Sequence, residues 1–264
     1  MPTTPCFLVD AFTAAPFRGN PAGVCLLAAP RSARWMQQVA GEMNQAETAF
    51  VSPMAGGFRL RWFTPLVEVD LCGHATLASA HVLYAEGLAP RAQPLRFHTR
   101  SGVLTCTARG SAIELDFPAR VAQEHAPPAG LLRALGTRAR WVGRNVDDWL
   151  VELASERAVC ELQPDLAALA RLEARGVVVT ARARRRGCDF VSRFFAPRVG
   201  VPEDPVTGSA HCALSPFWSQ RLGAAALRGF QASTRGGFVD VELRGERVCL
   251  RGRATTVVRG ELLA

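Results

Sequence analysis

The stretch Glu203-Asp204-Pro205-Val206-Thr207-Gly208-Ser209-Ala210-His211 guides the interpretation of the whole chain. It lies between an apolar segment at 190–195, which predicts a buried strand, and the segment 212–222, which predicts a helix despite Pro216. A carboxylate and a Gly-Ser pair therefore stand where a loop enters a helix. The first backbone N–H groups of a helix lack partners within it and carry the positive end of its dipole, so they suit an anionic ligand. An ordinary capped helix start would produce the same local pattern.

Length and composition predict an ordinary globular protein. The chain has 264 residues, enough for two compact domains, and it is 48% hydrophobic and 20% charged. Its apolar stretches are short and interrupted, and its N-terminus lacks the features of a signal peptide, so we predict no membrane span. The eight cysteines include no Cys-x-x-Cys pair. This favours reduced thiols and a cytoplasmic location over disulfides or zinc.

The basic residues exclude several classes of protein function. The net charge is +8, and because the sequence contains no lysine, all 31 basic residues are arginines. A Schiff-base lysine for pyridoxal phosphate and a P-loop lysine are therefore excluded, and no Gly-x-Gly-x-x-Gly fingerprint of a dinucleotide site occurs. The densest run, at 182–186, lacks interleaved aromatic residues, so we expect no nucleic-acid partner.

Both halves of the chain show the same order of predicted elements. In the first half we predict strands at 6–12, 47–51, 58–63 and over much of 95–116, with helices from a Ser32 cap to about Met43 and at 76–87. In the second half we predict strands at 149–153, 176–181 and 190–195, helices at 166–174 and 212–222, and a hairpin at 244–246. The segment 123–130, rich in Pro and Ala, predicts a linker.

Short sequence matches suggest that this order reflects an internal duplication. Thr99-Arg100-Ser101-Gly102 recurs as Thr234-Arg235-Gly236-Gly237, 135 positions further on. The same offset pairs the two expected helix starts, Gly73-His74 and Gly208-Ser209.

A duplication predicts one domain at 1–118 and another at 119–264, with the last strand crossing back to the first domain. The two helix starts would then face each other across a cleft, where a small acid could be held from both sides.

Five motifs spread over most of the chain resemble those of a known family. They occur in the same order as in that family, and the set is specific. They are Asp10-Ala11-Phe12, Gly19-Asn20-Pro21-Ala22-Gly23-Val24, Asn44-Gln45-x-Glu47-Thr48-Ala49-Phe50, Asp70-Leu71-Cys72-Gly73-His74-Ala75-Thr76 and Glu203-Asp204-Pro205-x-Thr207-Gly208-Ser209-Ala210. This set resembles the PhzF-like isomerase family of phenazine biosynthesis. The resemblance implies an α+β fold of the diaminopimelate epimerase type, with two similar domains, each a curved, barrel-like sheet around a central helix. The helices predicted at 76–87 and 212–222 would be these central helices, and a homodimer is implied because family members often form one.

The resemblance also implies a cofactor-free isomerisation by proton transfer. In the best-known family member a glutamate takes a proton from a carbon of a dihydro-hydroxyanthranilate and returns it elsewhere on the ring. Glu47 occupies the position of that glutamate. The matching positions of His74, Asp204 and Ser209 contact the substrate or help to move protons, and Asn20 lies in the motif that lines the same pocket.

Residue chemistry supports these roles independently, with simpler alternatives for each. Glu47 lies in an apolar context, and desolvation would raise its pKa from about 4.3 towards the range useful for a base at neutral pH. It would otherwise be a surface glutamate on the polar face of a strand. An uncharged His74 could pass a proton near neutral pH, or could make only a local hydrogen bond at a helix start. Asp204 and Ser209 would otherwise be ordinary helix-start residues.

Cys72 requires separate treatment. Racemases and epimerases of this fold use two cysteines, one ahead of each central helix, as base and acid. Here the second-half position is Ser209, whose hydroxyl cannot replace a thiolate, so we predict that Cys72 is a packed or pocket-wall thiol. The histidines form no metal-like spacing with acids or cysteines, so we predict no metal.

We therefore predict a PhzF-like isomerase that needs no cofactor and acts by general acid/base catalysis on a small carboxylate-bearing molecule. The helix starts at Gly73 and Gly208 would bind the carboxylate or developing negative charge. The rival enzyme is an amino-acid racemase or epimerase, which would require a second acid such as His74, Asp204 or Cys72. The other rival is a non-catalytic binding or scaffold protein on the same fold, which a Glu47→Gln variant with intact cellular phenotypes would favour.

Overall fold

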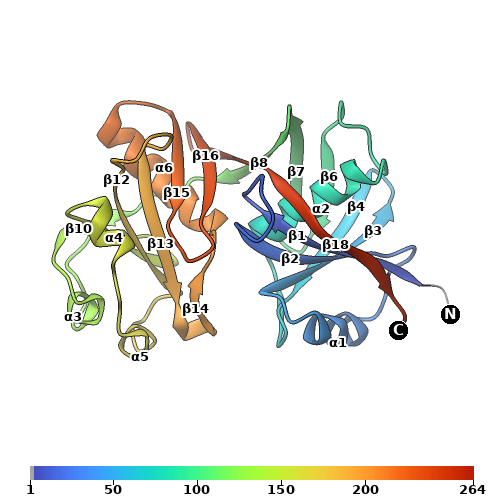
Figure 1. Cartoon of the computed structure of the whole chain (residues 1–264), viewed down its shortest axis with the longest axis horizontal. Coiled ribbons are helices and arrows are strands. Elements are labelled where there is room, and N and C mark those ends of the chain that lie inside the picture. Colours follow the sequence, from blue (N-terminus) through green and yellow to red (C-terminus); the bar gives the residue numbers. More distant parts are fainter. Residues whose placement is uncertain (1–2) are drawn as a thin grey trace. The chain divides into compact units, whose positions relative to one another are not determined.

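A computed structural model describes residues 3–264 and divides the chain into two compact units (Figure 1). The first unit comprises the residues up to Asp116 together with Arg251–Ala264, and the second comprises Phe117–Leu250. Each is a mixed α+β unit in which curved sheet packs around a central helix, which confirms the predicted fold class. Within the described residues, no helix is both long enough and apolar enough to span a membrane.

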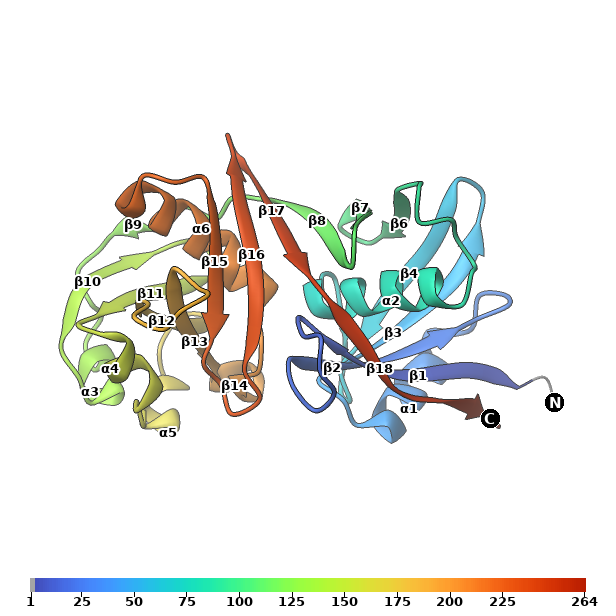
Figure 2. The ribbon, with the colours of Figure 1, turned by 45° about the horizontal axis from the view of Figure 1, so that its top comes forward.

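The first unit is built from strands around α2, with α1 on the outside (Figure 1). Its elements are β1 (Thr4–Ala11), β2 (Asn20–Leu26), α1 (Ala33–Met43), β3 (Glu47–Met54), β4 (Gly57–Phe63), β5 (Glu68–Val69), α2 (Gly73–Ala85), β6 (Leu95–Thr99), β7 (Gly102–Arg109), β8 (Ala112–Pro118) and β18 (Ala254–Leu262). The strand order is β18-β1-β2-β3-β4-β6-β7-β8. The pairs β2–β3 and β4–β6 are parallel and the others are antiparallel. Figure 2 shows β18 running beside β1 in this unit.

The second unit is organised in the same way around α6. Its elements are β9 (Gln123–Glu124), α3 (Leu131–Leu135), β10 (Ala139–Arg144), β11 (Asp148–Leu153), α4 (Glu156–Cys160), α5 (Leu166–Leu169), β12 (Gly176–Arg182), β13 (Phe190–Ala196), the 3₁₀ turn η1 (Pro197–Val199), β14 (Val201–Asp204), α6 (Gly208–Leu222), β15 (Ala226–Gln231), β16 (Gly237–Arg244) and β17 (Arg247–Gly252). The strand order is β9-β10-β11-β12-β13-β15-β16. Only β11–β12 and β13–β15 are parallel in this series.

The two units repeat one topology. The series β1-β2-β3-β4-β6-β7 and β10-β11-β12-β13-β15-β16 both alternate antiparallel and parallel pairs in the same order. The helices α2 and α6 begin at Gly73 and Gly208, and the hairpins turn after Arg109 and Arg244. Both correspondences have the offset of 135 found in the sequence.

Burial explains which helices are central. Nearly every residue of α2 from His74 to Tyr84 is buried, because the helix is surrounded by β1, β2, β3 and β18. By contrast, α1 buries only Met36, Val39 and Ala40 and covers the outside of β3 and β4. An apolar stripe on one face is typical of such a surface helix, whereas a helix that is apolar on all sides must lie in the core.

Pro216 lies inside α6 without breaking it. Proline has no N–H, so the carbonyl one turn earlier, on Cys212, loses its partner within the helix. The backbone N–H of Arg120 donates to that carbonyl at 3.0 Å. A backbone N–H from the segment between β8 and β9 therefore takes the place of the missing helical donor.

Several predicted boundaries differ from the structure. Both central helices begin at the helix starts that the repeat predicts, Gly73 and Gly208, so the segments predicted as helical at 76–87 and 212–222 leave out the first residues of each helix. The helix predicted at 166–174 is only Leu166–Leu169, since the next residues form turns, with the N–H of Leu172 bonded to the carbonyl of Leu169 at 3.1 Å. The predicted linker begins with strand β9, because Gln123 and Glu124 pair with β10.

Candidate active site

The first feature of the candidate site is a close pair formed by Glu47 and His74. Glu47 is the first residue of β3, and His74 is the second residue of α2. Atom Nε2 of His74 lies 3.3 Å from Oε2 of Glu47. The side chain of Glu47 is 21% exposed and that of His74 only 7%. The carboxylate is therefore the accessible member, and the imidazole lies behind it.

The imidazole of His74 is uncharged at neutral pH. Burial disfavours its charged form and lowers its pKa to about 4, although a backbone hydrogen bond at Pro21 acts in the opposite direction. An uncharged ring has one N–H donor and one acceptor nitrogen. It can therefore accept a proton on one side and release one on the other, which an always-charged group cannot do.

The other side of the ring contacts two more of the predicted residues. Atom Nδ1 of His74 lies 3.2 Å from Nδ2 of Asn20 and 3.5 Å from Sγ of Cys72. Asn20 is completely buried at the start of β2, and Cys72 is the N-cap residue of α2. The structure thus gathers Asn20, Glu47, Cys72 and His74, together with Gly73 at the first position of α2, in the first unit.

The same cluster offers three metal-ligating groups. One atom each from Glu47, Cys72 and His74 lie within 4.8 Å of one another. A carboxylate, a thiolate and an imidazole form a donor set that suits zinc. However, the ring faces the thiol through Nδ1 and the carboxylate through Nε2. Two nitrogens directed at different partners suit proton transfer through the ring better than ligands that converge on one ion.

The loop before Asn20 is held by a motif carboxylate and a motif glycine. Asp10 is buried and accepts a hydrogen bond from the N–H of Phe17 at 2.6 Å. Gly19 has φ +66°, and a Cβ atom there would lie 2.0 Å from the carbonyl oxygen of Ala11. Only glycine fits this conformation and this close approach. These two residues therefore set the path of the chain into Asn20.

A second motif glycine brings β2 close to β3. Gly23 is aligned with Thr48 in this parallel pair, one position after Ala22 is aligned with Glu47. A Cβ atom on Gly23 would lie 2.9 Å from the hydroxyl oxygen of Thr48. The close approach fixes the strand that carries Glu47 against the strand that begins with Asn20.

The second unit contains a separate polar cluster at the start of α6. Asp204, the last residue of β14, accepts a hydrogen bond from the hydroxyl of Thr207. Gln231 accepts from the N–H of Thr207 at 2.8 Å and donates to the carbonyl of Asp204 at 2.7 Å. Gly208 and Ser209 are the first two residues of α6, and Ser209 is partly exposed. Asp204 is therefore held by its neighbours in the turn that leads to α6.

Sequence reasoning missed Gln231. This residue is completely buried in β15, where Leu227, Gly229 and Gln231 face inward in alternation. A buried amide must find partners, and Gln231 finds them in the backbone of the turn that leads to α6. The sequence feature that could have predicted this role is a polar residue at a position of the strand that alternation places on its buried face.

The two central helices, like α3, have no side-chain cap from their N-cap residue. The helices α1, α4 and α5 have side-chain caps from Ser32, Ser155 and Asp165. Neither Cys72 at the start of α2 nor Thr207 at the start of α6 caps its helix through a side chain. Uncapped N–H groups at the positive end of a long helix are well suited to an anionic group.

Comparisons with known proteins place this chain in a family. A family model described as phenazine biosynthesis-like protein (PhzC-PhzF) matches residues 9–260. An uncharacterized isomerase of Halalkalibacterium halodurans is 50% identical over 264 residues, covering 100% of both chains. A crystal structure of a PhzF-family phenazine biosynthesis protein from Enterococcus faecalis has a TM-score of 0.95 and 39% identity, covering 100% of both chains.

A more distant structure shares only the fold. A hydroxyproline epimerase from Agrobacterium vitis has a TM-score of 0.67 at 11% identity, covering 98% of this chain and 92% of that one. The chain thus has the two-repeat α+β fold found in isomerases and epimerases. It belongs to the PhzF-like, phenazine biosynthesis-like family, as its motifs predict.

Proposed function

We propose that this protein is an isomerase that moves a proton on a small carboxylate-bearing molecule, such as a cyclic or simple amino acid, without a cofactor. Glu47 is the base that removes the proton and the acid that returns it. The observation that carries this proposal is the 3.3 Å contact between the partly exposed Glu47 carboxylate and the buried His74 ring. A carboxylate with an uncharged proton acceptor behind it can exchange protons with both substrate and protein.

The helix starts supply the complementary binding chemistry. The uncapped N–H groups of α2 and α6 bind the substrate carboxylate or the negative charge that develops when the proton leaves. Asp204, Gly208 and Ser209 take part in the same reaction from the second unit. Accordingly, Asp204→Asn and Ser209→Ala should slow proton exchange while leaving the free energy of unfolding nearly unchanged.

Proton NMR in D₂O tests the proposal. The protein is mixed with dihydro-hydroxyanthranilate and with a panel of amino acids, and deuterium incorporation and isomerised product are followed. Activity should disappear in Glu47→Gln and persist in Glu42→Gln, a matched change at an exposed glutamate of α1. Exchange that survives in Glu47→Gln would contradict the assignment of the base, and a wild-type protein inactive on every compound would contradict the proposed reaction.

A racemase or epimerase is the second candidate, because Cys72 adds a second group that can carry a proton to the cluster of Glu47 and His74. The thiol lies 3.5 Å from Nδ1 of His74, so it forms a second proton-carrying group on the far side of the ring from Glu47. Racemisation needs an acid that protonates the opposite face of the carbon. Deuterium at the α-carbon with loss of optical purity, abolished in Cys72→Ser, would establish this reaction, whereas an isomerase should tolerate that change.

A further inference from the structure

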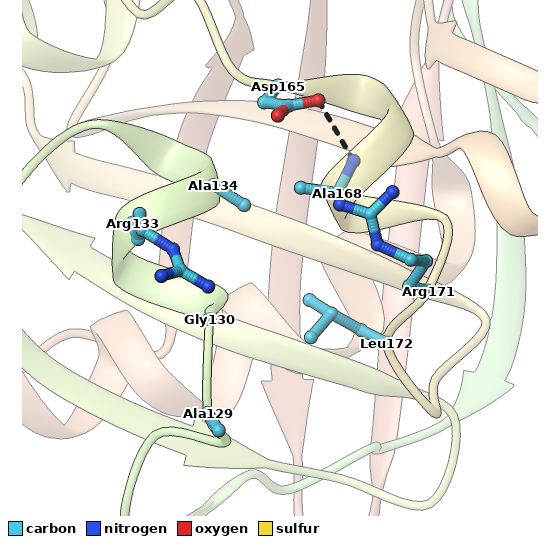
Figure 3. A pocket seen from close by; sticks show the side chains of 8 residues that line it. All are labelled: Ala129, Gly130, Arg133, Ala134, Asp165, Ala168, Arg171 and Leu172. Atoms are coloured by element: carbon cyan, nitrogen blue, oxygen red, sulfur yellow. Dashed lines mark hydrogen bonds between the residues drawn. The ribbon is translucent and has the colours of Figure 1, made fainter.

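The second unit contains a cavity that is lined by none of the residues assigned above to the candidate active site. It has a volume of about 340 Å³ and is bounded by α3 on one side and by α5 and the residues after it on the other (Figure 3). The two walls are joined by a hydrogen bond from the N–H of Asp165 to the carbonyl of Ala134 at 2.7 Å. The cavity shares no lining residue with the clusters of Glu47 or Asp204.

Two arginines direct their charges into this cavity. Arg133 lies on the α3 wall and Arg171 on the opposite wall, and their guanidinium groups point towards the space between them (Figure 3). Within residues 3–264, neither guanidinium has a hydrogen bond or an ion pair. The Arg133 group lies against the start of α3, where a Cβ atom on Gly130 would be 3.9 Å from Nη2.

The one carboxylate on the wall is already engaged. Oδ1 of Asp165 accepts a hydrogen bond from the N–H of Ala168 at 2.9 Å and so caps α5. Two guanidinium groups and one carboxylate leave the cavity with a net positive charge, and an anion placed between the guanidinium groups converts their mutual repulsion into two charge-assisted contacts. The cavity also exposes apolar surface from Ala134, Ala168 and Leu172.

From this arrangement we infer that the cavity between α3 and α5 is a second binding site, for a small dianion. The guanidinium fork matches the paired oxygens of carboxylate and phosphate groups, which a dicarboxylate or a phosphate monoester supplies at neutral pH. The apolar floor accommodates a short carbon skeleton. The site is independent of the proposed proton-transfer reaction.

Isothermal titration calorimetry with malonate and with inorganic phosphate tests the inference, at constant ionic strength set with chloride. The wild-type protein should bind at least one of these dianions saturably, and the stronger ligand shows whether the site prefers carboxylates or phosphate. Arg133→Gln and Arg171→Gln should each weaken binding by about tenfold or more, as expected for the loss of a charge-assisted contact. Both arginines are exposed, so neither change removes core packing.

Two further variants separate this site from other sources of binding. Arg138→Gln, a matched change at an exposed arginine that does not line the cavity, should bind as the wild type does. Glu47→Gln should also bind normally, because it alters only the first unit. A titration that is unchanged in both cavity variants, or that is lost in Glu47→Gln, would overturn the inference, as would the absence of saturable binding to the wild type.

Discussion

His74 lies with Nε2 3.3 Å from Oε2 of Glu47, while its other ring nitrogen faces Asn20 and Cys72. The ring thus contacts both the accessible carboxylate and the buried side of the cluster. We expect His74→Gln to slow proton exchange by about 100-fold, at the lower end of the range for a general acid/base group. His81→Gln, at another histidine of α2 that is bonded to Thr256, should retain the wild-type rate. Equal rates for wild type and His74→Gln would rule out a role for the ring in proton transfer.

Acid should destabilise the protein through its buried histidines. Burial lowers the pKa of both His74 and His211 to about 4, below the value of about 6.5 expected in the unfolded chain. Between these values the unfolded state binds protons that the folded state does not, so the free energy of unfolding falls as pH decreases from 6.5 towards 4. Each ring contributes a slope of up to about 1.4 kcal/mol per pH unit.

Urea unfolding at pH 7.5, 6 and 5 measures this slope. His211→Gln removes one of the two groups and should reduce the slope over this range by about one proton's contribution. A free energy of unfolding that is independent of pH from 7 to 5 would show that these rings are not buried in their uncharged form.

The ion pair between Arg193 and Glu203 should matter much more than an exposed one. Arg193 is 8% exposed, bonds both oxygens of Glu203 at 2.7 and 2.9 Å, and also donates to the carbonyl of Leu162 at 2.6 Å. Arg193→Met leaves these acceptors without a donor and should lower the free energy of unfolding by about 3 kcal/mol. The exposed pair of Arg157 and Glu161 is a suitable control, since Arg157→Met should leave stability unchanged by the same denaturation assay. Similar effects of the two changes would contradict the burial of Arg193.

Gly229 should not tolerate a side chain. A Cβ atom there would lie 2.5 Å from the ring of Phe190 and 3.0 Å from Nε2 of His211, and both side chains are fully buried. Gly229→Ala therefore overpacks the core and should cost about 1–3 kcal/mol. Gly260, also in a strand, has no atom within 4 Å of its Cβ position, so Gly260→Ala should be nearly neutral in thermal unfolding. A neutral Gly229→Ala would mean that the aromatic layer shifts more easily than close packing implies.

Local patterns were sufficient for much of the fold. Alternating and apolar runs predicted strands such as Phe58–Phe63 and Phe190–Phe195, because burial on a sheet imposes its spacing on neighbouring residues. The recurrence at an offset of 135 predicted the repeated topology, because each half must fold by the same local interactions. Helix lengths were less predictable, since the segment 166–174 was predicted to be helical and only Leu166–Leu169 forms a helix.

The candidate site could be predicted only in part from the sequence. Motifs predicted Glu47, His74 and Asn20 as candidate site residues. Their contacts, however, join positions far apart in the chain and depend on how the strands and the helix pack. Asn20 meets His74 across 54 positions, and Gln231 meets Thr207 across 24. Residue type establishes which chemistry a side chain can perform. The burial that lowers the pKa of His74 arises only when the chain folds, and so does the cavity that Arg133 and Arg171 share, because both depend on contacts between distant segments.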